Sequence, residues 1–437
     1  MSDLTVTRWV CTTANEPWRE MPPAAWADAG AGDLRLRIGK ARRQTWRGFG
    51  GCFNELGWKV LSALGDEDRR GVLRALFDER DGCGLNLCRL PIGANDYAES
   101  WYSHNETPGD FAMEHFSIER DRRSLIPYIR EAQQFCPRMT LLASPWSPPT
   151  WLKRPAAYNY GTLIWEDAHL QAYALYFLKF VQAYRAEGIA IDQVHVQNEP
   201  DSDQKFPSCR MSGPQMRDFI RDWLGPLFRR EGETCEIWAG TLERPDVNAW
   251  VNTILYDPQA RRYVAGLGFQ WAGKGAIQRA RQSWPDLPIL QTENECGDGK
   301  NTWTYAHYVF SLVQHYVTNG AAGYVYWNMV LQPGGVSTWG WPQNSLVTVD
   351  PALGRVRYRP EFHLMKHLSH FIRPGDAAVA VQGPWAANAV AFAGTDGRVV
   401  VVLDNPLGEA LPLTIEGAGC TLQVPAESFS TLCLTRR

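Results

Sequence analysis

From about residue 45 to residue 375, short apolar runs alternate with amphipathic stretches of helical periodicity. Eight apolar runs have the length of strands, at 46–53, 85–92, 139–146, 193–198, 235–241, 264–271, 287–293 and 321–328. Stretches with helical spacing lie between them, for example 67–80, 170–187 and 213–230. A strand followed by a helix, repeated about eight times, predicts an α/β fold of the parallel (β/α)8 TIM-barrel type.

The two ends of the chain have a different pattern. Residues 5–11 and 34–38 alternate apolar and polar positions, which is typical of half-exposed strands. After Pro374-Gly375, short strands separated by turn signals are predicted at 378–383, 388–393, 398–403, 411–415, 420–424 and 429–435. We therefore expect an antiparallel β-sandwich side domain built from both chain ends, residues 1–44 and 376–437, beside a catalytic barrel of residues 45–375.

Composition narrows the possible partners. The chain has 437 residues, a formal net charge of −3 and no run rich in lysine or arginine, which argues against nucleic acid. Its ten cysteines contain no CxxC pair, so we expect free, buried thiols. No apolar run is long enough for membrane insertion. The start lacks a signal-peptide pattern, so we expect a cytoplasmic protein, or a secreted one if a signal was trimmed. No pattern indicates an oligomeric state.

Motifs for cofactors are missing. The sequence has no GxGxxG or Walker-type loop, and no Gly-x-Ser-x-Gly elbow of a serine hydrolase. His363 and His367 have i,i+4 spacing, but no HExxH arrangement accompanies them, so packing or capping is the better interpretation. We expect no metal and no organic cofactor.

Two glutamates end two of the predicted strands. Glu199 lies in QVHVQNEP, at the end of the fourth strand, and Glu293 lies in LPILQTEN, at the end of the seventh. Two carboxyl groups at one face of a barrel are what glycoside hydrolysis requires, one as a proton donor and one ionised. Glu295 is an alternative to Glu293, because strand side chains two residues apart point the same way.

Other strand ends carry candidate binding residues. Arg89 ends the second strand in an apolar setting, and a buried arginine needs an anion, either the ionised glutamate or a structural partner. Asp96 follows that strand and could bind sugar hydroxyls or cap its loop. Trp146, Trp271 and Trp327 end strands, where they would stack on sugar faces or fill the core.

Several of these segments together resemble glycoside hydrolase family 30, which includes lysosomal glucosylceramidase. The resemblance runs through most of the chain, in order. It rests on Gly48-Phe-Gly-Gly51, Arg89-Leu-Pro91 with Asp96, LLASPWSPPTWLK at 141–153, Asn198-Glu-Pro200, Thr292-Glu293, Tyr326-Trp-Asn328 and FHLMKHLSHFIRPG at 362–375.

The resemblance implies a barrel with a β-sandwich side domain and a retaining, two-step mechanism. By position, Glu199 resembles the acid/base and Glu293 the nucleophile. Positions that contact the substrate or the nucleophile are matched by Arg89, Asp96, Trp146, Asn198 and Trp327.

One departure lies at the end of the sixth strand. Glucosylceramidase has His-Trp-Tyr there, and this chain has Gln270, Trp271 and Ala272. The tyrosine that would hydrogen-bond the nucleophile is missing, so another group must tune Glu293. Gln270 and Trp271 join the predicted substrate-binding residues.

These features predict a retaining, exo-acting β-glycosidase for a neutral β-linked sugar of the glucose, galactose, fucose or xylose type. Its partner would be a small saccharide or glycoside. A transglycosylase with the same two glutamates is an alternative. A non-catalytic carbohydrate-binding protein is another, which the two intact glutamates disfavour. A purely structural scaffold would leave Arg89 and the strand-end tryptophans unexplained.

Overall fold

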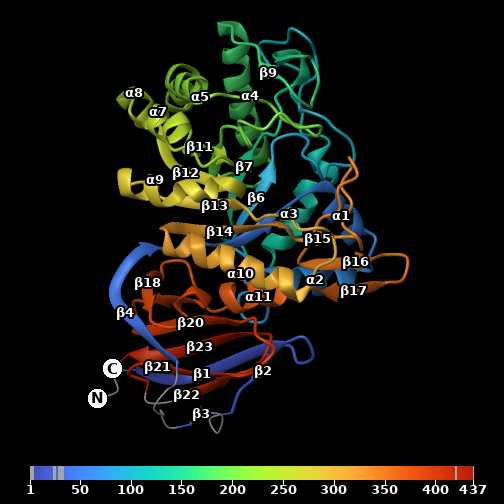
Figure 1. The fold of residues 1–437 in the computed structure, drawn as a ribbon. Coiled ribbons are helices and arrows are strands. Elements are labelled where there is room, and N and C mark those ends of the chain that lie inside the picture. Colours follow the sequence, from blue (N-terminus) through green and yellow to red (C-terminus); the bar gives the residue numbers. More distant parts are fainter. Residues whose placement is uncertain (1–3, 23–25, 28–33, 419–420, 437) are drawn as a thin grey trace.

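The computed structural model describes residues 4–22, 26–27, 34–418 and 421–436. Eight parallel strands close into a barrel in the order β10-β11-β12-β13-β14-β5-β6-β7 (Figure 1). The barrel strands are β5 (Gly48–Cys52), β6 (Leu87–Pro91), β7 (Thr140–Ser144), β10 (Gln193–His195), β11 (Glu236–Leu242), β12 (Val264–Gln270), β13 (Ile289–Glu293) and β14 (Ala321–Asn328). The predicted (β/α)8 barrel is confirmed.

All eight strands lie where the apolar runs predict them, because each is buried on both faces in a parallel barrel. The fourth strand differs from its prediction. β10 ends at His195, and beyond it only an isolated bridge joins Asn198 to Thr241 of β11. The chain therefore leaves regular strand geometry just before Glu199.

Helices surround the barrel. The larger ones are α1 (Glu55–Ser62), α2 (Asp66–Phe77), α3 (Leu125–Gln133), α4 (Asp167–Ala186), α5 (Gly213–Phe219), α6 (Gly225–Arg230), α9 (Ile277–Ser283), α10 (Trp303–Thr318) and α11 (Pro360–Ser369). The helix predicted over 213–230 is broken by a π-helical turn, η4 (Ile220–Leu224), between α5 and α6. None of the described helices is long and apolar enough to cross a membrane.

The barrel interior is filled by side chains from alternate positions of its strands. Leu87, Leu142, Trp238, Leu290 and Val325 form a cluster separate from the shell between strands and helices. β5 approaches β6 so closely that a Cβ at position 50, which is a glycine, would lie 1.6 Å from the carbonyl oxygen of Leu87. Gly50 of the GFGG segment thus lets the first two strands pack together.

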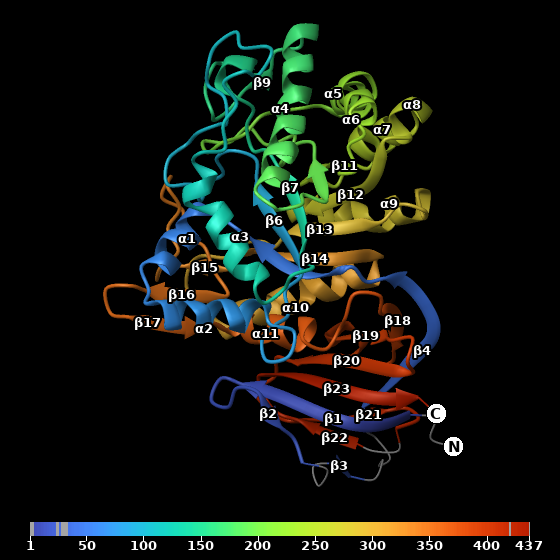
Figure 2. The ribbon, with the colours of Figure 1, turned by 180° about the vertical axis from the view of Figure 1, so that it is seen from behind.

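Both chain ends form the side domain. Its ten-stranded sheet has the order β2-β1-β23-β20-β19-β18-β4-β21-β22-β3, and it lies below the barrel in Figures 1 and 2. The strands are β1 (Leu4–Thr13), β2 (Arg19–Glu20), β3 (Trp26–Ala27), β4 (Leu34–Thr45), β18 (Ala377–Gln382), β19 (Ala389–Ala393), β20 (Arg398–Asn405), β21 (Leu411–Ile415), β22 (Thr421–Val424) and β23 (Ser428–Arg436). Residue 420, the first of a predicted strand, is outside the described residues.

The sheet folds over its own core. Leu36 of β4 and Leu413 of β21 belong to the same apolar cluster as Val401 of β20 and Leu432 of β23. One pairing departs from the expected antiparallel arrangement, because β4 and β21 run parallel. β4 then continues toward the barrel and ends at Thr45, three residues before β5 begins. The predicted domain boundaries stay a prediction.

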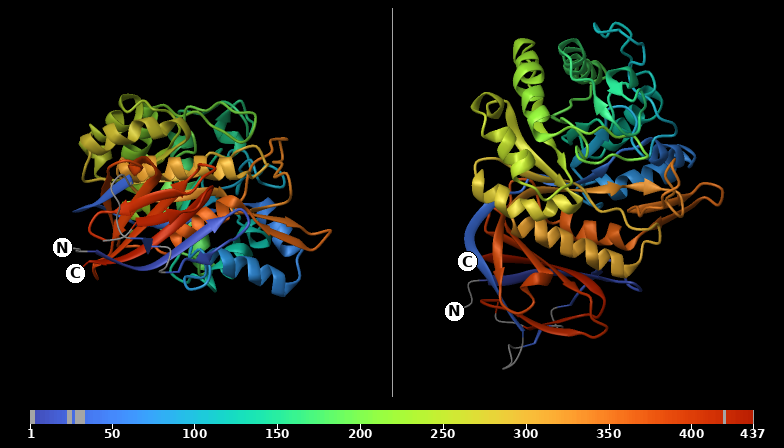
Figure 3. Two further views of the ribbon diagram at one scale, coloured as in Figure 1. Left: turned by 60° about the horizontal axis from the view of Figure 1, so that its bottom comes forward. Right: turned by 45° about the horizontal axis from the view of Figure 1, so that its top comes forward.

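Loops and two small sheets surround the barrel mouth. One sheet pairs β8 (Lys153–Arg154) with β9 (Thr162–Leu163), and the other joins β15 (Val330–Leu331), β16 (Val347–Asp350) and β17 (Arg355–Tyr358). The β16–β17 hairpin projects from the flank of the barrel in both views of Figure 3. Segment 97–116, which follows β6, contains no helix or strand.

His367 joins the barrel to the side domain. It is fully buried in α11, and its two ring nitrogens lie 2.8 Å from Thr431 Oγ1 of β23 and 2.8 Å from Thr12 Oγ1 of β1. Burial is the main cause that lowers the pKa of His367 to about 3, and the nearby His363 and Lys366 act in the same direction. The neutral ring therefore acts as a hydrogen-bonded link between the domains.

We expect His367→Ala to lower the free energy of unfolding at pH 7.5 by about 2–4 kcal/mol, because it leaves a cavity and two hydroxyl groups without their partner. The deficit should shrink at pH 5. The unfolded chain takes up a proton below the ordinary pKa of 6.5, while the folded wild type resists protonation down to about 3. Thermal midpoints at both pH values measure this, with exposed His115→Ala as control. An equal deficit at both pH values would contradict the pH dependence.

Candidate active site

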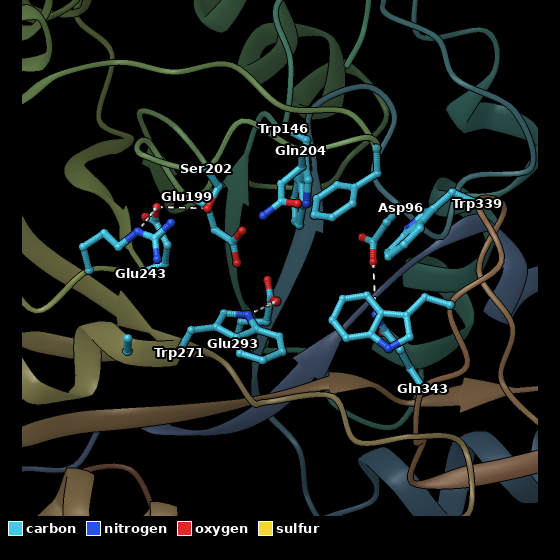
Figure 4. Close-up of a pocket in the computed structure, with 14 residues that line it drawn as sticks. Asp96, Trp146, Glu199, Ser202, Gln204, Glu243, Trp271, Glu293, Trp339 and Gln343 are labelled. Atoms are coloured by element: carbon cyan, nitrogen blue, oxygen red, sulfur yellow. Dashed lines mark hydrogen bonds and ion pairs between the residues drawn. The ribbon is translucent and has the colours of Figure 1, made fainter. Parts of the chain in front are cut away.

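A cavity of about 320 Å³ lies at the carboxyl ends of the barrel strands (Figure 4). The lining residues are Asp96, Trp146, Glu199, Ser202, Gln204, Phe206, Glu243, Arg244, Trp271, Ala272, Glu293, Trp339, Trp341 and Gln343. Both predicted glutamates are among them. This volume is at the lower end of the range typical of small-molecule sites, which suits one or two sugar rings.

The floor of the cavity is formed by side chains of β6 and β7, whose residues point alternately into the barrel and away from it. Leu87 and Leu142 point into the barrel, so Arg89 and Ser144, two residues further along, occupy the next layer toward the mouth. Arg89 is fully buried, and its Nε and Nη2 donate to Ser144 Oγ at 3.1 and 2.8 Å.

Arg89 also contacts the two strand ends that carry the glutamates. Its Nη1 donates to Glu293 Oε2 at 2.9 Å, and its Nη2 donates to Asn198 Oδ1 at 2.7 Å. Its Cζ lies 4.4 Å from the centroid of the Trp146 ring. Arg89 is thus the buried cation that balances the Glu293 carboxylate, and it positions the residue before Glu199.

Gln270, the last residue of β12, bridges the two glutamates. Its Oε1 accepts from Arg89 Nη1 at 3.2 Å and from Thr292 Oγ1 at 2.9 Å, so its amide nitrogen must face away from these donors. That nitrogen donates to Glu199 Oε1 and to Glu293 Oε2, at 3.1 Å in each case. The two carboxylate oxygens are therefore no farther apart than twice 3.1 Å.

The surroundings of the two carboxyl groups differ. Burial raises the pKa of Glu199 well above its ordinary value, and the charges of Glu293 and Glu243 raise it further. Burial also raises the pKa of Glu293, but Arg89 and the indole N–H of Trp271 oppose that rise. The proton shared by this pair therefore resides on Glu199, and Glu293 is the ionised partner.

Trp271 donates a hydrogen bond to Glu293, the role left vacant by the tyrosine that is missing at position 272. Its Nε1 donates to Glu293 Oε1 at 3.1 Å, so both oxygens of this carboxylate are hydrogen-bonded. Trp271 and Glu199 both have left-handed backbone conformations, with φ of 48° and 46°. Such a conformation is costly for residues other than glycine, and it aims both side chains into the site.

A wall forms the side of the cavity opposite Glu243. Asp96 Oδ2 accepts from Gln343 Nε2 at 3.4 Å, and Gln343 Oε1 accepts from Trp327 Nε1 at 2.8 Å. Burial, reinforced by Glu293, raises the pKa of Asp96 to about 8. Near neutral pH, Asp96 is therefore a protonated acid that can donate to, as well as accept from, a sugar hydroxyl.

Glu295 is engaged elsewhere. Its Oε1 lies 2.6 Å from Lys274 Nζ, and its Oε2 accepts from the Tyr308 hydroxyl at 2.6 Å. It does not line the cavity. This geometry favours Glu293 over Glu295 as the second glutamate of the site.

The nine predicted site residues fall into two groups. Those that line the cavity are Asp96, Trp146, Glu199, Trp271 and Glu293. The others lie behind the lining, where they contact the carboxylates or the wall: Arg89, Asn198, Gln270 and Trp327.

Sequence reasoning missed most of the loop residues of the site: Ser202, Gln204, Phe206, Glu243, Arg244, Trp339, Trp341 and Gln343. Only Glu243 could have been found from the sequence, because it is a glutamate directly after a strand, β11. Glu199 and Glu293 occupy similar positions at or after the ends of their strands. Among the described residues, no group of three or more His, Cys, Asp or Glu side chains is arranged to hold a metal ion.

A parallel eight-stranded barrel with two buried, hydrogen-bonded carboxyl groups at its strand ends defines a glycoside hydrolase of the barrel type. The model of the glycosyl hydrolase family 30 TIM-barrel domain matches residues 46–372, and the chain belongs to this family. The resemblance found in the sequence motifs is confirmed.

Several relatives cover most of the chain. It is 29% identical to the lysosomal acid glucosylceramidase of Mus musculus, over 88% of this chain and 80% of the relative. It is 26% identical to an endo-1,6-beta-D-glucanase of Neurospora crassa, over 86% and 82%. The solved structure of an endo-beta1,6-glucanase superposes over 100% of both chains, with a TM-score of 0.85 and 23% identity, which shows the shared fold.

We expect Glu199→Gln to raise the thermal midpoint at pH 8. The folded protein resists ionising Glu199, whereas the unfolded chain ionises it above the ordinary pKa of 4.5, so wild-type stability is lost as the pH rises. Glutamine removes this penalty, and the gain should be smaller at pH 5. Scanning calorimetry at both pH values tests this, with Glu67→Gln, an exposed position on α2, as control. A gain that is independent of pH would contradict the electrostatic explanation.

Proposed function

We propose that the chain is a retaining β-glycosidase in which Glu293 is the nucleophile and Glu199 the acid/base. The observation that carries this proposal is the shared amide nitrogen of Gln270, which limits the separation of the carboxylate oxygens to twice 3.1 Å. Retaining enzymes have carboxyl groups about 5–5.5 Å apart, whereas inverting enzymes need about 6.5–9.5 Å to admit a water molecule.

The mechanism has two steps. In the first, a Glu293 oxygen attacks the anomeric carbon while Glu199 gives its proton to the leaving oxygen, and a glycosyl ester of Glu293 forms. In the second, the ionised Glu199 takes a proton from water, which attacks the anomeric carbon and releases Glu293. Arg89 and Trp271 stabilise the Glu293 carboxylate before the attack and after its release.

The wall beside Asp96 supports exo action. The Tyr97 hydroxyl donates to the Gly335 carbonyl at 2.6 Å, and the Thr338 N–H donates to the Asp96 carbonyl at 3.4 Å. These bonds tie the loop between β15 and β16 to the segment after β6. A sugar chain that continued beyond the glycone would meet this wall, so the site fits a terminal sugar.

The glycone is a neutral sugar. Asp96 and Gln343 line the end of the cavity where the glycone would bind, and Arg244, the cavity's lining arginine, lies beside Glu243. A uronate carboxylate would therefore face Asp96 without a cation to pair with it. The relatives are named for glucosylceramide and for 1,6-linked glucan, so glucose is the first of the neutral sugars to test.

Glu293→Gln should lower kcat by about a thousandfold or more on every substrate, because the covalent step is lost. Glu199→Gln should cost about 10²- to 10⁴-fold on substrates with poor leaving groups, and less on nitrophenyl glycosides. Rates of nitrophenol release from a panel of nitrophenyl β-glycosides (glucoside, galactoside, fucoside, xyloside, glucuronide) identify the sugar that the enzyme prefers. The matched control is Glu295→Gln. Retained activity in Glu293→Gln, or an α-anomer as first product by NMR, would refute the assignment.

Exo action predicts the products from a β-1,6-linked glucose tetrasaccharide. We expect glucose and a trisaccharide at early time, because the wall beside Asp96 admits only the terminal residue. The same tetrasaccharide with its terminal 6-hydroxyl blocked should resist cleavage. Chromatography of the early products decides this, and disaccharide as the first product would indicate endo action instead.

A further inference from the structure

The cavity has a second end, opposite Asp96. In Figure 4, Glu199 and Glu293 lie between Asp96 on one side and Glu243 on the other. Glu243 directly follows β11, and it lines the cavity together with Arg244 and Ser202. The mechanism proposed above gives no role to Glu243 or Arg244.

Glu243 is a buried carboxylate with one occupied and one free oxygen. Its Oε1 accepts from the Asp201 N–H at 3.1 Å and from Ser202 Oγ at 3.0 Å. Its Oε2 is buried and has no hydrogen-bond partner among the described residues. Burial raises the pKa of Glu243 to about 6, so the group is mostly ionised at neutral pH. Leaving an ionised oxygen buried and unpaired is costly, which is typical of a site that awaits a donor.

Arg244 adds free donors beside this carboxylate. Its Nε lies 3.5 Å from Glu243 Oε1 and 3.4 Å from Asp201 Oδ2, and its side chain is 47% exposed. Its two terminal NH₂ groups make no hydrogen bond to the described residues. An acceptor and a set of donors therefore stand next to each other at this end of the cavity.

Ala272 lines the same cavity as Glu243 and Arg244. Ala272 has the smallest side chain in the cavity lining. A Cβ at position 273, which is a glycine, would lie 2.0 Å from the carbonyl oxygen of Leu242 and 3.4 Å from Cα of Glu243. The turn that carries Ala272 thus packs directly against the strand end that carries Glu243.

We propose that Glu243 and Arg244 form the binding site for the leaving group, and that this site takes a second sugar rather than a hydrocarbon. Sugar hydroxyls both donate and accept, so they match a free carboxylate oxygen and free guanidinium N–H groups. A hydrocarbon would desolvate both charges without replacing their hydrogen bonds. The site lies next to Glu199, the group that protonates the leaving oxygen. This inference rests on the proposed function and specifies its substrate as a di- or oligosaccharide.

The test uses the glycosyl-enzyme intermediate, in which the leaving group has departed. An added alcohol can then bind in the empty leaving-group site and accept the sugar in place of water. The bond from the anomeric carbon to Glu293 breaks, a bond to the alcohol oxygen forms, and the alcohol proton goes to Glu199. Water reacts by the same path with the same base. The ratio of transfer to hydrolysis therefore cancels any change in the basicity of Glu199 and measures acceptor binding alone.

Nitrophenyl β-glucoside, or whichever nitrophenyl glycoside is cleaved fastest, serves as donor, with methyl β-D-glucoside or 1-butanol as acceptor. We expect Arg244→Leu to lower the ratio for methyl β-D-glucoside about tenfold, the effect of losing one charge-assisted hydrogen bond, and to leave the ratio for 1-butanol unaltered. Glu243→Gln, which keeps an oxygen for Asp201 and Ser202, should act in the same direction.

Arg210→Leu is the matched control. Arg210 also pairs with Asp201, at 3.4 Å, and its side chain is 53% exposed, but it does not line the cavity. The Arg210→Leu variant should have the wild-type ratio of transfer to hydrolysis for both acceptors. The leaving-group site alone would be overturned if the ratio of transfer to hydrolysis fell equally for both acceptors. It would also be overturned if neither Arg244→Leu nor Glu243→Gln lowered this ratio for methyl β-D-glucoside. A wild type that releases no nitrophenol from any glycoside would overturn the proposed function itself, and the site with it.

Discussion

The buried guanidinium of Arg89 is the interaction on which the site depends. It is fully enclosed by the barrel, and it donates to Glu293, Asn198, Gln270 and Ser144. A charge at this depth is tolerated only when it is paired and its N–H groups are all used. Because these partners come from four different strands or strand ends, Arg89 on β6 fixes the arrangement of the strand ends that carry the two glutamates.

Charge balance then decides which glutamate keeps a proton. The cavity contains four buried carboxyl groups, on Asp96, Glu199, Glu243 and Glu293, and Arg89 is the fully buried cation that faces them. Arg89 lies against Glu293, where it opposes the rise in pKa that burial causes. The pKa of each of the other three is raised by burial. The cluster lowers the stability of the fold as the pH rises, and it places a protonated carboxyl group next to an ionised one.

The sequence predicts the parts of the site that strands carry. The ends of the apolar runs locate Arg89 and Glu293, because each is a charged residue at the end of a strand that is otherwise apolar. The loop residues Gln343 and Arg244 could not be found this way, since no periodicity sets the direction of a side chain in a loop. β10 shows the same limit: the apolar run predicts a strand over 193–198, but the strand ends at His195, and the run itself does not signal this end.

The end of β12 shows how one role can move between neighbouring residues. The tyrosine that glucosylceramidase places after its tryptophan is Ala272 here, and Glu293 nevertheless has a donor on each oxygen, from Gln270 and Trp271. Since these two donors satisfy the carboxylate, Glu293 needs no hydrogen bond from position 272. A small residue there leaves the space beside Glu243 and Arg244 open. The hydrogen bonds to Glu293 and the space beside Glu243 therefore both depend on three consecutive residues, Gln270, Trp271 and Ala272.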